Sequence, residues 1–132
     1  MRTILLVDDE EEMRKKYKKI LEDAQFRVIE APDALEVTNI LMREKSNIDL
    51  IILDIQMPNI DGREIFEIID QYAPSIQVIV SSVLPLQEQK LRISRAVDFY
   101  NKSHKPETLL GKINYLLGLD QGVKSSADGS AV

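Results

Sequence analysis

Acidic, hydroxyl and basic residues stand at or just beyond the ends of four short apolar runs in this sequence. These residues are Asp8, Asp9, Asp54, Ser82 and Lys102. The runs are rich in β-branched residues and indicate strands. In an open parallel sheet the carboxyl ends of the strands share one edge, and such folds bind their ligands there. We therefore expect three carboxylates, a hydroxyl and an ammonium to meet in one crevice, which is a metal and phosphoryl site in outline.

This set of groups suits phosphoryl transfer. Mg²⁺ prefers hard oxygen ligands, and a divalent cation relieves the repulsion between clustered carboxylates. One carboxylate can then attack a phosphoryl group and form an acyl phosphate. The equatorial oxygens of that group need neutralisation, which a metal, the Lys102 ammonium and the Ser82 hydroxyl can supply. Each residue alone has an ordinary structural role, so the prediction depends on their convergence.

Strand-like runs alternate with helical patterns along the whole chain. We expect strands over residues 3–7, 26–30, 48–53, 76–81 and 97–100. We expect helices over residues 11–24, from a cap at Asp33, after Asp61-Gly62, over residues 86–96, and from Pro106 to a C-cap at Gly118. Five strands and five helices in alternation predict an α/β fold, a three-layer doubly wound sandwich around a five-stranded parallel sheet.

Size and composition indicate one soluble domain. The 132 residues can bury a core without staples, and the absence of cysteine suits a reducing, cytoplasmic location. A net charge of −5 argues against binding to nucleic acid or to an anionic membrane. The first apolar run, residues 4–7, is too short for a signal or spanning segment. We expect the domain to cover residues 1–119, with a polar tail or linker over residues 120–132.

The motifs around these residues resemble a response-regulator receiver domain of two-component signalling. They read ILLVDDE at residues 4–10, LDIQMPNIDG at 53–62, VSS at 80–82 and DFYNK at 98–102. The resemblance covers about residues 2–117, and residues 54–62 are a highly specific part of it. It implies a flavodoxin-like fold with the strand order 2-1-3-4-5.

The resemblance also implies roles for the acidic residues and the lysine. Asp54 would be the phosphoacceptor and, with Asp9, a direct ligand of Mg²⁺, while Asp8 would act largely through water. The backbone carbonyl of Gln56 would complete the protein ligands, and Mn²⁺ is an alternative ion. Lys102 would pair with a phosphoryl oxygen. The chain would promote its own phosphorylation and dephosphorylation rather than act as a turnover enzyme.

Two further residues would form the switch by the same resemblance. Ser82 would be the hydroxyl that moves to the phosphate, and Phe99 the aromatic that follows it inward. The neighbouring Ser81 leaves a second register open. We favour Ser82, because the apolar run precedes it at the offset usual in the family.

Some positions depart from the usual pattern of the family. Ser103 follows the lysine where proline is usual, and Lys102 comes only 20 residues after Ser82, a shortened interval. Arg95 stands where glycine is usual, and the branched Val83 stands beside the switch hydroxyl where a small residue is usual. We expect the catalytic chemistry to be intact and the surface that signals onward to be reshaped.

The leading hypothesis is a signalling switch that receives a phosphoryl group from a sensor histidine kinase or a phosphotransfer protein. A homodimer through the helix at residues 86–96, the last strand and the last helix is a further expectation, and the basic residues of the first helix could dock the kinase. One alternative is a dimerisation or docking module that works without phosphorylation. Another is a Mg²⁺-dependent phosphohydrolase, against which Gln56 argues, since such enzymes commonly carry an acid at that position.

Overall fold

The structure is a computed structural model that describes residues 1–54, 62–83 and 98–119. Its elements are β1 (Thr3–Val7), α1 (Glu11–Asp23), β2 (Arg27–Ala31), α2 (Ala34–Glu44), the 3₁₀ turn η1 (Lys45–Asn47), β3 (Leu50–Asp54), α3 (Gly62–Tyr72), β4 (Gln77–Ser82), β5 (Asp98–Asn101) and α5 (Pro106–Leu116). The strands form one parallel sheet in the order β2-β1-β3-β4-β5. The predicted class and strand order are confirmed. The helix expected over residues 86–96 and the tail lie outside the described residues.

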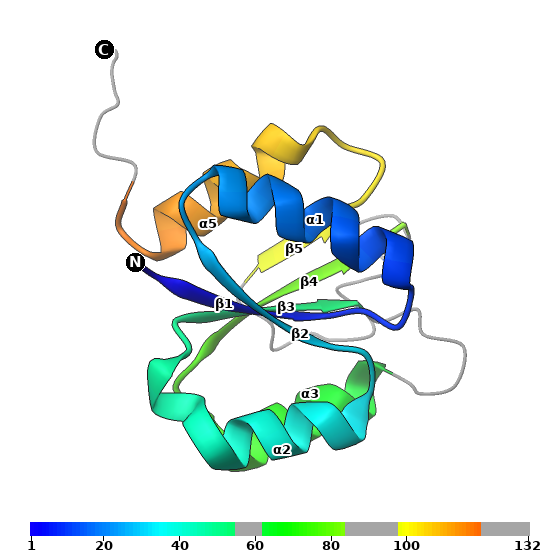
Figure 1. Cartoon of the computed structure of the whole chain (residues 1–132), viewed down its shortest axis with the longest axis vertical. Helices are drawn as coiled ribbons and strands as arrows, with labels where there is room; N and C mark the ends of the chain where they lie inside the picture. Colours follow the sequence, from blue (N-terminus) through cyan, green and yellow to red (C-terminus); the bar gives the residue numbers. More distant parts are fainter. Residues whose placement is uncertain (55–61, 84–97, 120–132) are drawn as a thin grey trace.

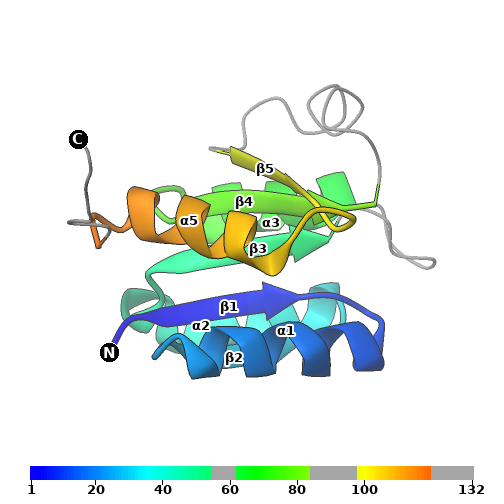
Figure 2. The same ribbon diagram turned by 90° about the horizontal axis from the view of Figure 1, so that it is seen from above.

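The sheet separates two helical layers. Helices α1 and α5 cover one face and α2 and α3 cover the other (Figure 1), and the view from above shows the strands running between them (Figure 2). Successive residues of a strand face opposite sides, so each strand contributes to two cores. Ile4 and Leu6 pack with the α1 and α5 side chains, whereas Leu5 and Val7 pack with those of α2 and α3. This alternation also decides which face each strand-end residue joins.

The helices bury the faces that their sequence periodicity predicts. Helix α1 buries Tyr17 and Leu21. Helix α2 has the predicted cap, since the Asp33 side chain accepts a hydrogen bond from the Glu36 amide at 2.9 Å. Helix α2 buries Val37, Ile40 and Leu41. None of the helices in the described ranges has the length and apolar character needed to cross a bilayer.

The end of α5 differs by one residue from the expectation. Its last helical residue is followed by Leu117 as C-cap, and Gly118 lies one position further with a φ of 69°. The Gly118 amide donates to the Tyr115 carbonyl at 3.2 Å, and the Leu119 amide donates to the Asn114 carbonyl at 2.7 Å. This paired arrangement closes a helix when the residue after the cap can adopt the left-handed conformation, which glycine does without strain.

Several strands begin and end one or two residues later than predicted. Strand β3 starts at Leu50 rather than residue 48. Just before it, Asp49 contacts β1: its carboxylate accepts from the Thr3 amide at 2.8 Å, and its own amide donates to the Thr3 carbonyl at 2.9 Å. At the other end, β3 includes Asp54 and β4 includes Ser82. These two predicted site residues are therefore the last residues of strands, held by the ladder rather than by a loop.

Candidate functional site

Three carboxylates converge at the carboxyl edge of the sheet. Asp8 follows β1 directly, and Asp54 ends β3 beside it. One carboxylate oxygen from each of Asp8, Asp9 and Asp54 can be chosen so that all lie within 4.8 Å of one another. Asp8 is 3 % exposed and Asp54 is 6 % exposed, whereas Asp9 is half-buried. Buried carboxylates need a charge partner or a bound cation.

Lys102 supplies a positive charge inside this cluster. Its Nζ lies 2.8 Å from Oδ2 of Asp8 and 3.5 Å from Oδ2 of Asp54, and its side chain is 8 % exposed. The lysine comes directly after β5, and its amide donates to the Ser82 carbonyl at 2.8 Å. The structure thus brings Asp8, Asp54 and Lys102 together from three strands, as the sequence predicted.

One ammonium does not neutralise three carboxylates. Burial raises the pKa of the Asp9 carboxyl above its ordinary value, and repulsion from Asp8 raises it further, although Lys102 and Arg14 pull in the opposite direction. The remaining negative charge and the oxygen-only donor set fit a hard divalent cation such as Mg²⁺. Asp8, Asp9 and Asp54 could therefore hold such an ion.

The main chain at Asp8 is held from several sides. Its carboxylate Oδ1 accepts from the Glu10 amide at 2.9 Å, and its amide donates to the Ala31 carbonyl at 3.2 Å. Its carbonyl accepts from Nη1 of Arg14 at 2.8 Å, and Arg14 Nε lies 3.3 Å from Oε1 of Glu30. Sequence reasoning missed Arg14 and Glu30. The available signal was weak: a cation in the first turn of a helix opposes the helix dipole, so such a residue needs a specific partner.

The two candidate hydroxyls lie on opposite faces of β4. Ser81 pairs with Asp54 in the β3–β4 register and lines a small cavity with Tyr17, Lys102 and other residues on the α1 and α5 side. Ser82 is fully buried, and strand alternation directs it to the face of α2 and α3. Phe99 is 7 % exposed and packs in the core of that same face. Ser82 and Phe99 thus share a face, and the switch role assigned to them stays a prediction.

The remaining predicted positions have different outcomes. Gln56 lies outside the described residues, as does Arg95. Val83 is 60 % exposed directly after the switch candidate. Ser103, in place of the usual proline, donates from its amide and its hydroxyl to the Asn101 side chain at 2.9 and 2.7 Å. The turn after β5 is therefore held by side-chain hydrogen bonds at the position where proline is usual in the family.

Comparison with known proteins identifies the family. Residues 4–114 match the response regulator receiver domain. The chemotaxis protein CheY of Listeria monocytogenes is 38% identical over 88 residues, which are 66% of this chain and 72% of that protein. Response regulator TrrA of Thermotoga maritima, solved in complex with Mg²⁺-BeF, is 30% identical with a TM-score of 0.75, over 88% of this chain and 99% of that one. The chain belongs to the response regulator receiver domain family and is a receiver domain of two-component signalling.

Other relatives are longer proteins. The transcriptional regulatory protein YxdJ of Bacillus subtilis is 27% identical over 133 residues, and this chain accounts for 57% of its length. Across four curated relatives the chain spans from 9% to 57% of their length. Receiver domains bind Mg²⁺ at an aspartate cluster, interact with histidine kinases or phosphotransfer proteins, and signal rather than turn over a substrate. None of these comparisons supports a docking module that works without phosphorylation.

Proposed function

We propose that Asp54 is the phosphoacceptor of this receiver domain and takes its phosphoryl group from a phosphohistidine of a sensor kinase or phosphotransfer protein. The observation that carries the proposal is the convergence of Asp54 with two further carboxylates and the Lys102 ammonium at one buried sheet edge. Because Asp54 is the last residue of β3, the sheet fixes its backbone and the direction of its Cα–Cβ bond. Such fixed geometry favours attack on an incoming phosphoryl group.

The transfer uses the groups of this chain as follows. A carboxylate oxygen of Asp54 attacks phosphorus, the N–P bond of the phosphohistidine breaks, and the leaving imidazole takes a proton from solvent. Asp8, Asp9 and Asp54, with the Gln56 carbonyl, would hold Mg²⁺ or Mn²⁺, which when bound neutralises charge on the phosphoryl oxygens. Lys102, already 3.5 Å from Asp54, moves its ammonium to a phosphoryl oxygen.

The signal leaves the site through β4 and β5. The Lys102 amide donates to the Ser82 carbonyl, so a shift of either residue is felt by the other. We propose that Ser82 turns its hydroxyl to the phosphoryl group and that Phe99 follows, which biases a two-state arrangement of β4, the helix expected over residues 86–96 and β5. A homodimer through that expected helix, β5 and α5 would be favoured by phosphorylation.

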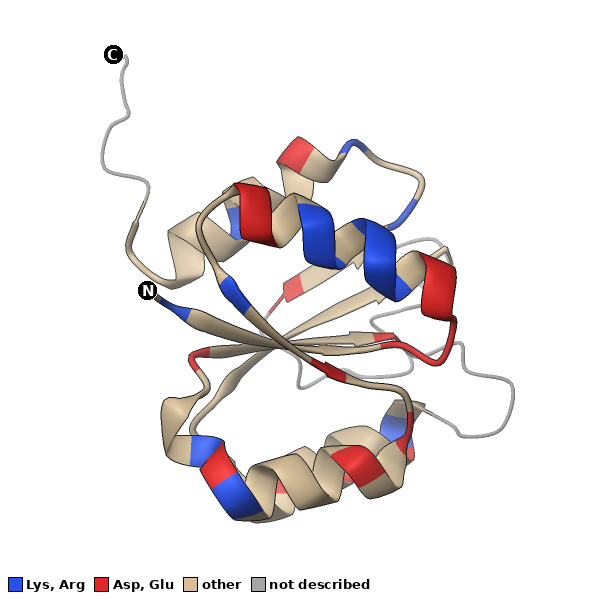
Figure 3. Ribbon diagram, viewed as in Figure 1, with Lys and Arg blue, Asp and Glu red and all other residues tan. Residues whose placement is uncertain are grey.

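The kinase contact and the domain limits complete the proposal. Helix α1 carries the basic residues Lys15, Lys16, Lys18 and Lys19. In Figure 3 the blue of Lys and Arg lies in the middle of the α1 ribbon, and both ends of the helix are red. This helix is our candidate surface for the phosphodonor. We assign residues 1–119 to the domain and residues 120–132 to a tail or linker, and the cytoplasmic location expected from the cysteine-free composition stays a prediction.

The direct test is intact-mass analysis after exposure to a small-molecule phosphodonor with Mg²⁺. The wild type should gain the mass of one phosphoryl group, Asp54→Ala should gain none, and the control Asp23→Asn, an exposed carboxylate on α1, should match the wild type. A gain that survives Asp54→Ala would contradict the assignment. Addition of beryllofluoride should shift the oligomeric state, and an unchanged state would argue against the proposed dimer.

A further inference from the structure

We propose that Arg14 is a positioning residue for the cation seat, holding the peptide between Asp8 and Asp9 so that both carboxylates face the site. The inference rests on the proposed Mg²⁺-dependent function and names a residue outside the ligand set. Arg14 contacts neither Asp54 nor an incoming phosphoryl group in this proposal. It acts through the main chain.

The contacts of Arg14 show how it can hold that peptide. Its Nη1 donates to the Asp8 carbonyl at 2.8 Å, and its Nε lies 3.3 Å from the Glu30 carboxylate. The arginine side chain is 14 % exposed. Because the guanidinium is planar and rigid, these two contacts are fixed relative to one another. The direction of the Asp8 carbonyl sets the plane of the peptide that leads into Asp9.

The end of β2 anchors both sides of Asp8. The Asp8 amide donates to the Ala31 carbonyl at 3.2 Å, while the Asp8 carbonyl is tied to Glu30 through Arg14. Glu30 is itself held by Lys18, whose Nζ lies 3.2 Å from its second oxygen. Strand β2 lies at the opposite edge of the sheet from β5. Contacts from β2 therefore hold the Asp8–Asp9 part of the candidate metal site. These contacts come from the edge of the sheet opposite β5, the strand that Lys102 follows.

If Arg14 acts through its charge, its removal should change Mg²⁺ affinity in one direction. If it acts by positioning the ligands, its removal should change the affinity in the other. A positive side chain near a cation seat repels Mg²⁺, and Arg14 is close enough to lower the pKa of Asp9. If charge were its only effect, removal of Arg14 would tighten Mg²⁺ binding. If Arg14 positions the Asp8–Asp9 peptide, removal loosens the ligands and weakens binding despite the lost repulsion. The sign of the change therefore separates the two roles.

The experiment is a calorimetric Mg²⁺ titration of the full chain at a temperature where thermal melts show every variant folded. We expect Arg14→Gln to weaken binding about tenfold, the size typical of residues that orient metal ligands. Arg14→Lys keeps the charge but loses the rigid fork, so it should also bind more weakly. Arg27→Gln removes the same charge from an exposed ion pair with Glu44 at the start of β2, and should stay within about twofold of the wild type.

A second readout needs no metal. The Glu10 amide donates to the Asp8 carboxylate, so its hydrogen exchange reports the order of this peptide. Exchange at Glu10 should accelerate in Arg14→Gln, while amides in β3 and β4 stay as protected as in the wild type. Binding in Arg14→Gln as tight as or tighter than in the wild type, or unchanged Glu10 exchange, would overturn the positioning role alone. A wild type that binds no Mg²⁺ would overturn both this inference and the proposed function.

Discussion

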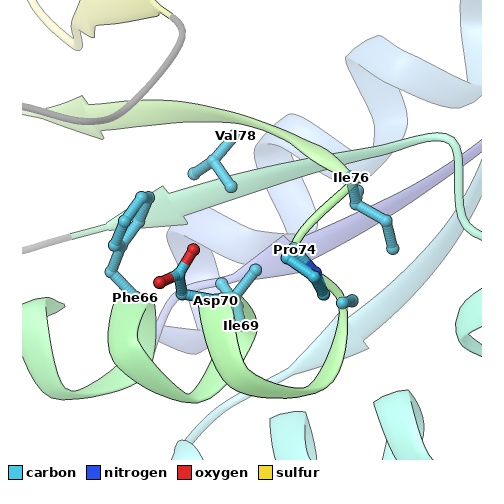
Figure 4. A pocket seen from close by; sticks show the side chains of 7 residues that line it. Phe66, Ile69, Asp70, Pro74, Ile76 and Val78 are labelled. Atoms are coloured by element: carbon cyan, nitrogen blue, oxygen red, sulfur yellow. The ribbon is translucent and has the colours of Figure 1, made fainter.

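The two ends of the parallel sheet differ in the volume of the cavity found there and in the residues that line it. At the amino-terminal end of β4 lies an open hollow of about 260 Å³ between α3 and the strand (Figure 4). Its lining residues are Phe66, Ile69, Asp70, Ala73, Pro74, Ile76 and Val78. At the carboxyl end, the cavity beneath Lys102 is far smaller, yet it is bordered by Asp8, Asp54 and Ser81. Space and reactive groups are thus found at opposite ends of the same strands.

The difference has a structural cause. The carboxyl ends of β1, β3 and β5 place acidic and basic groups against one another, where burial strengthens every electrostatic interaction. Among the described residues that line the larger hollow, Asp70 alone bears a charge, and it lies on the solvent-exposed side of α3. Our proposed site thus lies at the end where charged groups converge, and not at the end with the larger cavity.

The largest effect should come from Lys102→Ala. This change leaves Asp8 and Asp54 buried without their ammonium, so we expect a loss of about 3–5 kcal/mol in the free energy of unfolding, measured by urea denaturation. Lys112→Ala is the matched control: its ion pair with Asp98 is more exposed, and we expect a loss below about 1 kcal/mol. Equal losses in the two variants would remove the contrast between the site and the surface.

A smaller effect of opposite sign is expected for Asp9→Asn. Removal of this carboxylate relieves burial and repulsion from Asp8, so the metal-free variant should be more stable than the wild type. It should also lose the stabilisation that Mg²⁺ gives the wild type. Thermal melts with and without Mg²⁺ measure both quantities. A variant that is less stable without metal would show that Asp9 contributes to the apo fold.

The difference in stability between the wild type and Asp9→Asn should depend on pH. The pKa of Asp9 is raised in the folded state from its ordinary value of 3.8, so the folded state binds this proton more readily than the unfolded chain. Protonated Asp9 therefore makes its full contribution to the stability of the fold below pH 3.8. This contribution is lost as the pH rises through the pKa that Asp9 has in the folded state. Without Mg²⁺, the advantage of Asp9→Asn should be present at pH 7 and shrink as the pH falls toward 3.8. A constant advantage across this range would contradict the assignment.

The smallest effect is expected in the larger hollow. Asp70→Asn should change the free energy of unfolding by less than about 1 kcal/mol, because the residue is exposed. Mg²⁺ affinity and phosphorylation should match those of the wild type. A clear loss of phosphorylation in this variant would mean that the amino-terminal end contributes to function after all.

Much of the sheet and of the charged site could be predicted from sequence, because strand periodicity and shared strand direction place Asp8, Asp54 and Lys102 at one edge. The contact between Arg14 and Glu30 could not be predicted, since the two residues are 16 positions apart in the sequence and meet only when β2 packs beside β1. The faces of Ser81 and Ser82 could not be predicted either, because Val78, Ile79 and Val80 are all apolar and their sequence does not show which helical layer each residue meets.

The most direct test of the central claim compares the two ends in one experiment. Amide chemical shifts of the full chain should be recorded before and after addition of Mg²⁺ and beryllofluoride. We predict the largest shifts at Asp9, Asp54, Ser82 and Lys102, with residues 66–78 nearly unchanged. Shifts concentrated at residues 66–78, with the carboxyl edge unmoved, would contradict the account.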